Sequence, residues 1–566
     1  MNDIKVQDAG YTGSDAEKSN SNDQPADLHI RGFETAADFQ LHKGLKSRHI
    51  TMIAIGGAIG TGLIIGTGRA LANSGPGSLL IGYAFMGFLV WIVMCAVGEM
   101  AAWLPMSAGF SGYATRYCHP SLGFALGWVY WFKYIIVTPN QLTAGALAFQ
   151  FWVDRDTVNP GVFIAIFLVA IFCINYFGGI KFFGEFEFWL SSFKVMVIVG
   201  IILFSLCIAC GAGPNAERAP GFYTWQNPGA FRPLYAEGSL GRFLGFWAVM
   251  VNATFAYLGT ELVGVTAAEA QSRKSVSKAI KLTFYRILIF YVLSVLLVGM
   301  IVPYDSDELA FALEAGSNAN ASPFVAAANI AGVEILPHIL NVCILVFVFS
   351  AANSDLYIAS RTLYGLASDE SAPAIFKRTD RRGVPYPALF LCTAIAFIAF
   401  LNVSDDSRTV FLYFVNLVTI FGLLTWISIL VSHIYFIKAR RVQGIENSQL
   451  MFVAPLGLWG SYIALFFCCL VALTKNFEVF IERDGVTFDY RNFITGYLGI
   501  PVYIIFLFGH MFYTRSKGVK PHEADFYLGK DIVDRAEDAY NAAQAEKRLA
   551  NAGRSNFYKR YVAWLF

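Results

Sequence analysis

The stretch Gly56-Gly57-Ala58-Ile59-Gly60-Thr61-Gly62 lies near the middle of an apolar run that extends from residue 50 to residue 71. Glycine loses more backbone entropy than other residues when it becomes helical, so we expect a membrane helix to break here. Broken helices at membrane depth are tolerated where the freed backbone lines a cavity. Close helix packing is the alternative explanation, because Gly56 and Gly60 have the spacing of a G-x-x-x-G motif.

The composition around this stretch is that of an integral membrane protein. Of 566 residues, 56% are hydrophobic and 14% are charged, whereas soluble domains carry about 25% charged residues. Crossing a bilayer takes roughly 20 mostly apolar residues in an α-helix. The formal net charge of +2 gives no excess positive charge for nucleic acid, so no nucleic-acid partner is expected.

Twelve apolar runs predict an all-α protein of twelve transmembrane helices, six within residues 49–267 and six within residues 268–514. The expected spans are 50–71, 78–104, 122–150, 160–178, 186–211, 243–267, 284–303, 336–366, 387–402, 409–437, 453–474 and 494–514. The polar N-terminal tail, 1–48, is expected to be flexible. The charged C-terminal tail, 515–566, has a helical pattern at 531–551.

Loop charges predict the orientation of these helices. With the N-terminus inside, the inner loops carry 14 Lys and Arg residues and the outer loops carry 8. Because cytosolic loops are enriched in basic residues, both termini are expected in the cytosol. The two tails would then be accessible to cytosolic trafficking or ubiquitination machinery, and the remainder of the chain would face the lipid bilayer.

A second interruption, at residues 256–261, falls in the sixth expected span. Matching breaks in the first and sixth spans predict two inverted repeats of five helices, in which both breaks face one central site. The eleventh and twelfth spans lie outside this repeat.

Ionisable residues within the expected spans are costly in hydrocarbon and are therefore functional candidates. Five such residues are Lys133, Lys194, Glu261, Asp355 and Arg361. Arg361 is expected to extend toward the cytosolic interface. Four glutamates nearer the expected cytosolic helix ends are predicted to pair there with loop lysines and arginines; they are Glu99, Glu185, Glu187 and Glu269.

Several motifs in register resemble the fungal amino-acid permeases of the APC superfamily, the YAT family. They are the runs 48–62, 184–194, 259–262 and 350–354, and the resemblance covers roughly residues 40–520. Within the family, the runs 132–134, 139–143 and 353–357 are most similar to the dicarboxylic amino-acid permeases. The resemblance implies a LeuT-type fold and proton symport of glutamate and aspartate at the plasma membrane. No cofactor is implied besides the coupled proton.

Each part of such a substrate has an expected place at the two breaks. The N–H groups at the start of a half-helix favour a carboxylate, because the helix dipole is positive there. These groups belong to Gly60, Thr61 and Gly62. The α-ammonium is expected to meet backbone carbonyls freed beside the breaks. These carbonyls lie near Ala58, Ala256 and Gly259.

Selectivity for acidic substrates is assigned to the third expected span. Gln141 stands where family members for neutral and cationic amino acids carry Glu, a charge that would repel a second carboxylate. Lys133 lies near the bilayer centre and could neutralise that carboxylate, with Asn140 as an uncharged donor. The alternative is that Lys133 pairs permanently with Glu261 or Asp355 and never meets substrate.

Proton coupling is assigned to Lys194 and Glu261, since burial can shift their pKa values as the site opens and closes. By resemblance, Lys194 occupies the place where sodium-coupled relatives of the fold bind a cation. A fixed structural charge is the alternative for both residues. Tyr257 resembles an aromatic gate of the fold, although an aromatic side chain in a membrane core usually serves packing.

Other function classes fit the sequence less well. A broader permease for amides or neutral amino acids remains a competing function, and a non-transporting amino-acid sensor is a weaker one. No H-E-x-x-H or G-x-S-x-G motif stands in a suitable context, so neither an enzyme nor a metal site is expected. The nine cysteines are expected to be small buried hydrophobes.

Overall fold

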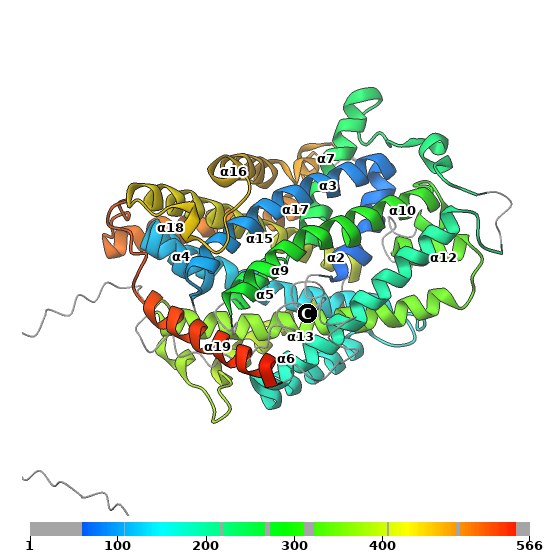
Figure 1. Cartoon of the computed structure of the whole chain (residues 1–566). Coiled ribbons are helices and arrows are strands. Elements are labelled where there is room, and N and C mark those ends of the chain that lie inside the picture. The colour runs from blue at the N-terminus through cyan, green and yellow to red at the C-terminus, as the bar shows by residue number, and fades with distance from the viewer. Residues whose placement is uncertain are drawn as a thin grey trace, which may run out of the picture. The chain divides into compact units, whose positions relative to one another are not determined.

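The computed structural model describes residue 52 and residues 59–106, 108–214, 219–266, 272–310, 322–403, 407–482 and 487–550. Within these ranges the regular structure is entirely helical, as predicted (Figure 1). Among the described residues, ten helices are long and apolar enough to cross a membrane, and one shorter apolar helix covers Tyr386–Leu401. The ten helices are Gly66–Trp103, Pro120–Phe149, Pro160–Gly178, Phe182–Ala209, Gly238–Gly264, Arg273–Ile301, Leu336–Ser368, Thr409–Val442, Gly457–Phe480 and Tyr490–Thr514.

These helices coincide closely with the expected spans from the third onward. The first expected span is described continuously only from Ile59, so the count of twelve stays a prediction. One junction differs from the prediction, because α6 (Pro160–Ala209) continues through the expected loop at 179–185. The expected junction at 72–77 agrees with α3 (Gly66–Trp103), in which two helices meet at a kink. Within α3 the chain changes direction at Gly75, whose φ of 80° favours glycine, and Pro76 then suits the first turn of the second arm.

The predicted break in the sixth span is confirmed. Helix α7 (Gly238–Tyr257) ends where Leu258 becomes extended, and Gly259 follows with a φ of 87°, a conformation that favours glycine. A short helix, α8 (Leu262–Thr266), then continues the span. The break is therefore encoded locally, by one glycine in the left-handed region.

The predicted break in the first span is described on one side only. Gly60 is extended, with φ −135° and ψ −162°, and a short helix, α2 (Thr61–Ile64), begins directly after it. Ala58 and the preceding glycines lie outside the described residues. Helix α2 packs against α7, α3 and α13 (Leu336–Ser368).

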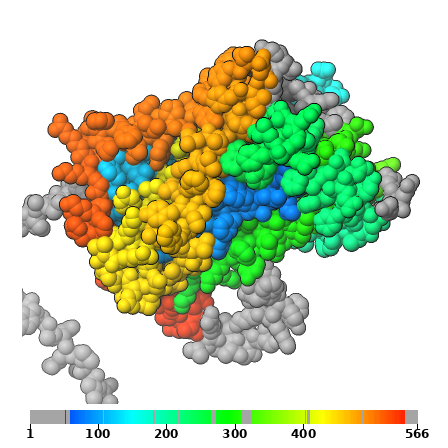
Figure 2. Space-filling model, turned by 90° about the horizontal axis from the view of Figure 1, so that it is seen from above, coloured from blue at the N-terminus to red at the C-terminus, as the bar shows by residue number. Residues whose placement is uncertain are grey.

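The interior is built around α5 (Pro120–Phe149), which packs against α13 and α15 (Ser407–Val442). Helix α3 packs against α7, α10 and α16. Figure 2 shows α3, in blue, between green and yellow-orange elements. The remaining α-helices are α4 (Gly109–Tyr117), α9 (Arg273–Arg286), α10 (Ser294–Ile301), α11 (Asp307–Ala310), α12 (Pro323–Ile330), α14 (Tyr386–Ala396), α16 (Gly457–Thr474), α17 (Tyr490–Tyr497) and α18 (Gly499–Thr514).

The charged C-terminal segment forms the predicted helix, α19 (Lys530–Ala550), and docks on the membrane domain. Arg273, at the start of α9, pairs with Asp534 at 2.7 Å and with Glu537 at 2.5 Å. Burial alone would raise the pKa of Asp534. The hydrogen bond from Lys530 and the positive charge of Arg273 outweigh it, so this pKa lies below its ordinary value.

Candidate substrate site at two broken helices

The helix segments beside the two breaks, α2 and the end of α7, pack directly against each other through their backbones. A Cβ atom added at Gly62 would lie 2.6 Å from the Cα atom and 2.8 Å from the backbone nitrogen of Ala256. Only glycine permits this approach between α2 and the end of α7, since real Cβ atoms do not come so close to backbone atoms. The packing explanation for the glycine-rich stretch therefore applies at Gly62.

Gly60 and Thr61 have different surroundings from Gly62. A Cβ atom added at Gly60 would meet no heavy atom within 4 Å, so open space lies beside this residue. The Thr61 hydroxyl donates a hydrogen bond of 3.0 Å to the Gln141 side-chain oxygen on α5. The structure thus brings together predicted site residues that are 80 positions apart in the sequence.

Lys133 is paired within the protein. Its ammonium donates to the Glu261 carboxylate, and the exposed fractions of the two residues are 1% and 0%. The ammonium also lies 4.7 Å from the centre of the Tyr134 ring, a distance that suits a cation–π contact. Trp426 donates to the second oxygen of Glu261 at 3.4 Å. This geometry is that of the alternative in which Lys133 is a structural counter-ion.

Two further polar groups near Gln141 have unsatisfied atoms. Neither side-chain polar atom of the buried Asn140 has a hydrogen-bond partner among the described residues, and the same holds for Oδ2 of Asp355. The Gln141 side chain forms a hydrogen bond with the Asp355 carboxyl group. Buried polar atoms without partners are uncommon and often mark a binding site.

The other predicted residues at the second break make internal contacts. Tyr257 is fully buried, donates to the Tyr83 carbonyl at 2.9 Å and stacks on Tyr291 with ring centres 4.5 Å apart. The Gly259 carbonyl accepts from Leu262 at 3.1 Å. The Ala256 carbonyl accepts no backbone hydrogen bond from outside α7 within the described ranges. Among the described residues the Ala256 carbonyl therefore has no backbone donor from outside α7, while Tyr257 has the contacts of a packing residue.

Lys194 belongs to a buried cluster between α6 and α13. Its ammonium lies 3.7 Å from the Glu187 carboxylate and makes no hydrogen bond to a described residue. The same carboxylate accepts from Ser191 at 3.0 Å and from Ser354 at 2.9 Å. The expectation that Glu187 pairs at the cytosolic interface is wrong, because this residue is only 2% exposed and its cation lies within the membrane span.

A second buried cluster, around Glu99, was not predicted from the sequence. Glu99 lies 3.3 Å from both the His433 ring and the Arg440 guanidinium, and it accepts from the Ala454 N–H at 2.8 Å. Pairing of Glu99 with a basic residue was predicted, but the histidine was not. Nothing in the local pattern around His433 distinguishes it from a histidine that packs in a core.

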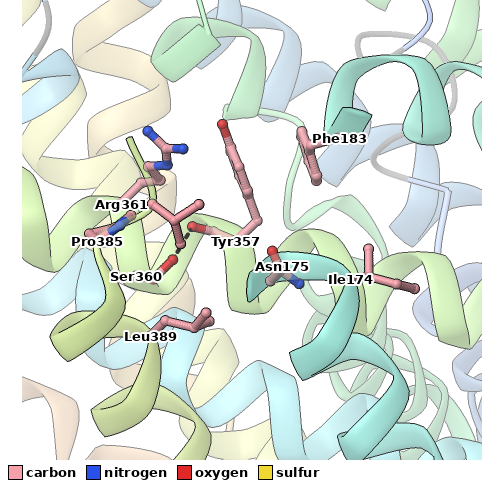
Figure 3. Close-up of a pocket in the computed structure, with 9 residues that line it drawn as sticks. Ile174, Asn175, Phe183, Tyr357, Ser360, Arg361, Pro385 and Leu389 are labelled. Atoms are coloured by element: carbon pink, nitrogen blue, oxygen red, sulfur yellow. Dashed lines mark hydrogen bonds between the residues drawn. The ribbon is translucent and has the colours of Figure 1, made fainter. Parts of the chain in front are cut away.

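Arg361 lies beside a small cavity between α6, α13 and α14 (Figure 3). Its guanidinium is 4.9 Å from the centre of the Tyr357 ring, which stacks on Phe183. The cavity volume is about 10 Å³, which is room for about one water molecule. It is too small to hold an amino acid.

The sequence of the chain is similar to those of known proteins over most of its length. The amino acid permease family model matches residues 49–522. The chain is 52% identical to the dicarboxylic amino acid permease of Saccharomyces cerevisiae, covering 93% of this chain and 87% of that protein. It is 37% identical to the proline-specific permease of Emericella nidulans, with 93% of both chains covered. Identity to the lysine-specific permease of Saccharomyces cerevisiae is also 37%, over 85% of this chain and 77% of that one.

The fold has a relative among solved structures. The manganese transporter of Eremococcus coleocola aligns with a TM-score of 0.52 and 14% identity, covering 86% of this chain and 98% of that one. Likeness at this identity supports the LeuT-type transporter fold and says nothing of the substrate. The family match and the fungal relatives, which extend over most of the membrane-spanning region, show that the chain belongs to the amino acid permease family of membrane transporters.

Proposed function

We propose that this protein is a proton-coupled symporter that takes up acidic amino acids, L-glutamate and L-aspartate, across the plasma membrane. It would have twelve transmembrane helices, of which ten form a 5+5 inverted repeat, and both termini would lie in the cytosol. The observation that carries the proposal is the meeting of α2 and α7, where Gly62 packs on the backbone of Ala256.

Several local features support a substrate site at this meeting point. Open space beside Gly60 and the N–H groups of Gly60 and Thr61 suit the α-carboxylate. The Ala256 carbonyl suits the α-ammonium. Gln141, which accepts from Thr61, is a neutral residue at the position where a glutamate would repel a second carboxylate.

Proton coupling is proposed for Lys194 and Glu261, each of which is buried against an opposite charge. A buried ion pair favours the charged forms, and opening the pair to water or to substrate changes that preference. A conformational change in the cycle could thereby release or accept a proton.

One observation favours a competing function, a permease for amides or neutral amino acids. Because Lys133 is already paired with Glu261, it offers no free positive charge to a side-chain carboxylate of the substrate. Two relatives are named for proline and lysine, so the family accommodates several substrates.

Uptake into proteoliposomes containing the purified full-length protein tests the proposal. An inward proton gradient should drive accumulation of labelled glutamate, and unlabelled aspartate should compete better than glutamine or proline. Accumulation that follows a sodium gradient would contradict the coupling. Equal competition by glutamine would support the broader permease, and binding without any uptake would support a sensor.

A further inference from the structure

A second cavity, of about 400 Å³, lies beyond the helix breaks. Its walls come from α3, α7, α15 and the segment that joins α16 to α17. Its size is within the range of small-molecule sites, roughly 300–1,000 Å³. The proposed cytosolic termini would place it on the extracellular side.

The position of the cavity relates it to the proposed substrate site. Asn252 on α7 lines the cavity and lies one helical turn before Ala256, where Gly62 packs. Arg69 lines the cavity from the first arm of α3, two turns after Thr61. A molecule in this cavity is therefore next to the broken helices on the same two elements.

Two cations in the cavity wall have no carboxylate partner among the residues that the structure describes. The Lys475 side chain is 1% exposed, and its ammonium donates to three neutral oxygens, those of Asn416, Thr419 and Asn476, at 3.2, 3.2 and 2.8 Å. These bonds use its three N–H donors, so Lys475 acts on an anion in the cavity through its charge. The half-buried Arg69 makes no hydrogen bond or ion pair with any residue that the structure describes. Buried cations without an anion are costly, and a bound anion would offset that cost.

We propose that this cavity is an outer binding site for the acidic amino acid, in which Arg69 binds a carboxylate and the charge of Lys475 attracts the anion before it reaches the helix breaks. This inference rests on the proposed function. It assigns the recognition of the second carboxylate to residues that the sequence patterns did not single out.

The cavity wall carries both signs of charge that an α-amino dicarboxylic acid presents. Such a molecule has two carboxylates and one ammonium group. Arg69 and Lys475 supply two cations. Glu478, which accepts from Tyr235, and Asp489, which accepts from Asn492, line the same cavity and make its wall acidic on one side. Charge-assisted hydrogen bonds, such as one from Arg69 to a carboxylate, are the stronger ones in proteins.

The outer site also accounts for the pairing of Lys133. At the helix breaks, Lys133 is neutralised by Glu261 and Gln141 is uncharged. A preference for acidic substrates then needs positive charge elsewhere on the route, and Arg69 and Lys475 provide it. Glutamine, which has one carboxylate fewer, would gain less from the two cations.

The test is glutamate uptake by the purified full-length protein in proteoliposomes, with KM and kcat determined separately. Arg69→Gln should raise the KM for glutamate about ten-fold, the loss of one charge-assisted hydrogen bond. Lys475→Gln should also raise this KM, because it removes one positive charge beside the cavity. The kcat and the KM for glutamine, measured for the wild type and each variant, should change less than about two-fold. Lys475→Arg should retain most of the glutamate affinity because it keeps the charge.

Arg242→Gln is the matched control, because Arg242 is an exposed arginine near the start of α7 that does not line the cavity. It should leave the KM for glutamate unchanged. An unchanged KM in Arg69→Gln, or a loss of kcat and thermal stability in place of a KM effect, would overturn the outer site. Absence of glutamate uptake by the wild type would instead overturn the proposed function itself.

Discussion

The ammonium of Lys133 on α5 is paired with the carboxylate of Glu261. Glu261 lies in the break between α7 and α8, directly before α8 begins. The pair joins two helices whose residues are 128 positions apart, and it is fully buried. Glu261 accepts in addition from the indole of Trp426 and, at 3.4 Å, from the Gly259 N–H. The carboxylate thereby holds the left-handed turn at Gly259 against α5 and α15.

The first prediction concerns this pair. Lys133→Met should destabilise the protein by about 3–5 kcal/mol, because the buried Glu261 carboxylate loses its partner. The double variant Lys133→Met/Glu261→Gln should recover part of that loss, since no unpaired charge remains. Thermal unfolding of the purified variants in detergent measures both effects. A folded Lys133→Met protein that loses binding of glutamate alone would instead identify Lys133 as a selectivity residue.

The second prediction separates two neighbouring glycines. Gly62→Ala should lower stability by about 1–3 kcal/mol, because its methyl group would overlap the Ala256 backbone. Gly60→Val should leave the fold intact, since open space lies beside Gly60, but should block substrate binding by filling that space. Unfolding temperature and glutamate binding are measured on both variants. Normal binding by Gly60→Val would exclude the carboxylate site at this turn.

The third prediction concerns coupling at Lys194. Lys194→Arg should preserve the ion pair with Glu187 but should abolish proton-driven accumulation, because an arginine does not release its proton at physiological pH. Exchange of internal for external substrate needs no net proton movement and should persist. Both activities are measured in proteoliposomes with and without a pH gradient. Accumulation by the Arg variant equal to that of the wild type would show that Lys194 is only a fixed charge.

The fourth prediction concerns pH and the docking of α19. The pKa of Asp534 is lower in the docked state than in a free chain, so its contribution is complete above the ordinary aspartate pKa, about 3.9, and is lost as pH falls through the docked value. The distance between spin labels on α19 and α9 should therefore stay constant from about pH 8 to about pH 5 and increase only below about pH 4.

A matched pair of variants checks this assignment. Asp534→Asn should loosen α19 at neutral pH, because it removes one of the two carboxylates that pair with Arg273. Asp531→Asn should not, because the partner of Asp531 in the described part of the chain is the exposed Arg535 on the same helix. Identical label distances in the two variants would contradict a role for Asp534 in docking.

Local sequence determined the class of fold and the positions of most helices. Apolar runs of sufficient length have few alternatives to a membrane-spanning helix, because every backbone polar group must be satisfied within the lipid. The break at Gly259 was also predictable, since a single glycine allows the left-handed turn there. The continuous helix through 179–181 was not, because a short glycine-containing junction does not show whether helical hydrogen bonding stops.

The partners of the ionisable residues were decided by tertiary structure alone. The sequence identified Lys133 and Lys194 as costly charges in the membrane, but it left open which acid neutralises each of them. Glu187 lies seven positions before Lys194, whereas Glu261 reaches Lys133 from another helix. The cations of the outer cavity, Arg69 and Lys475, are brought to one space by α3 and the segment after α16. Periodicity along one helix carries no information about contacts between side chains of different helices, because these contacts depend on how the helices pack.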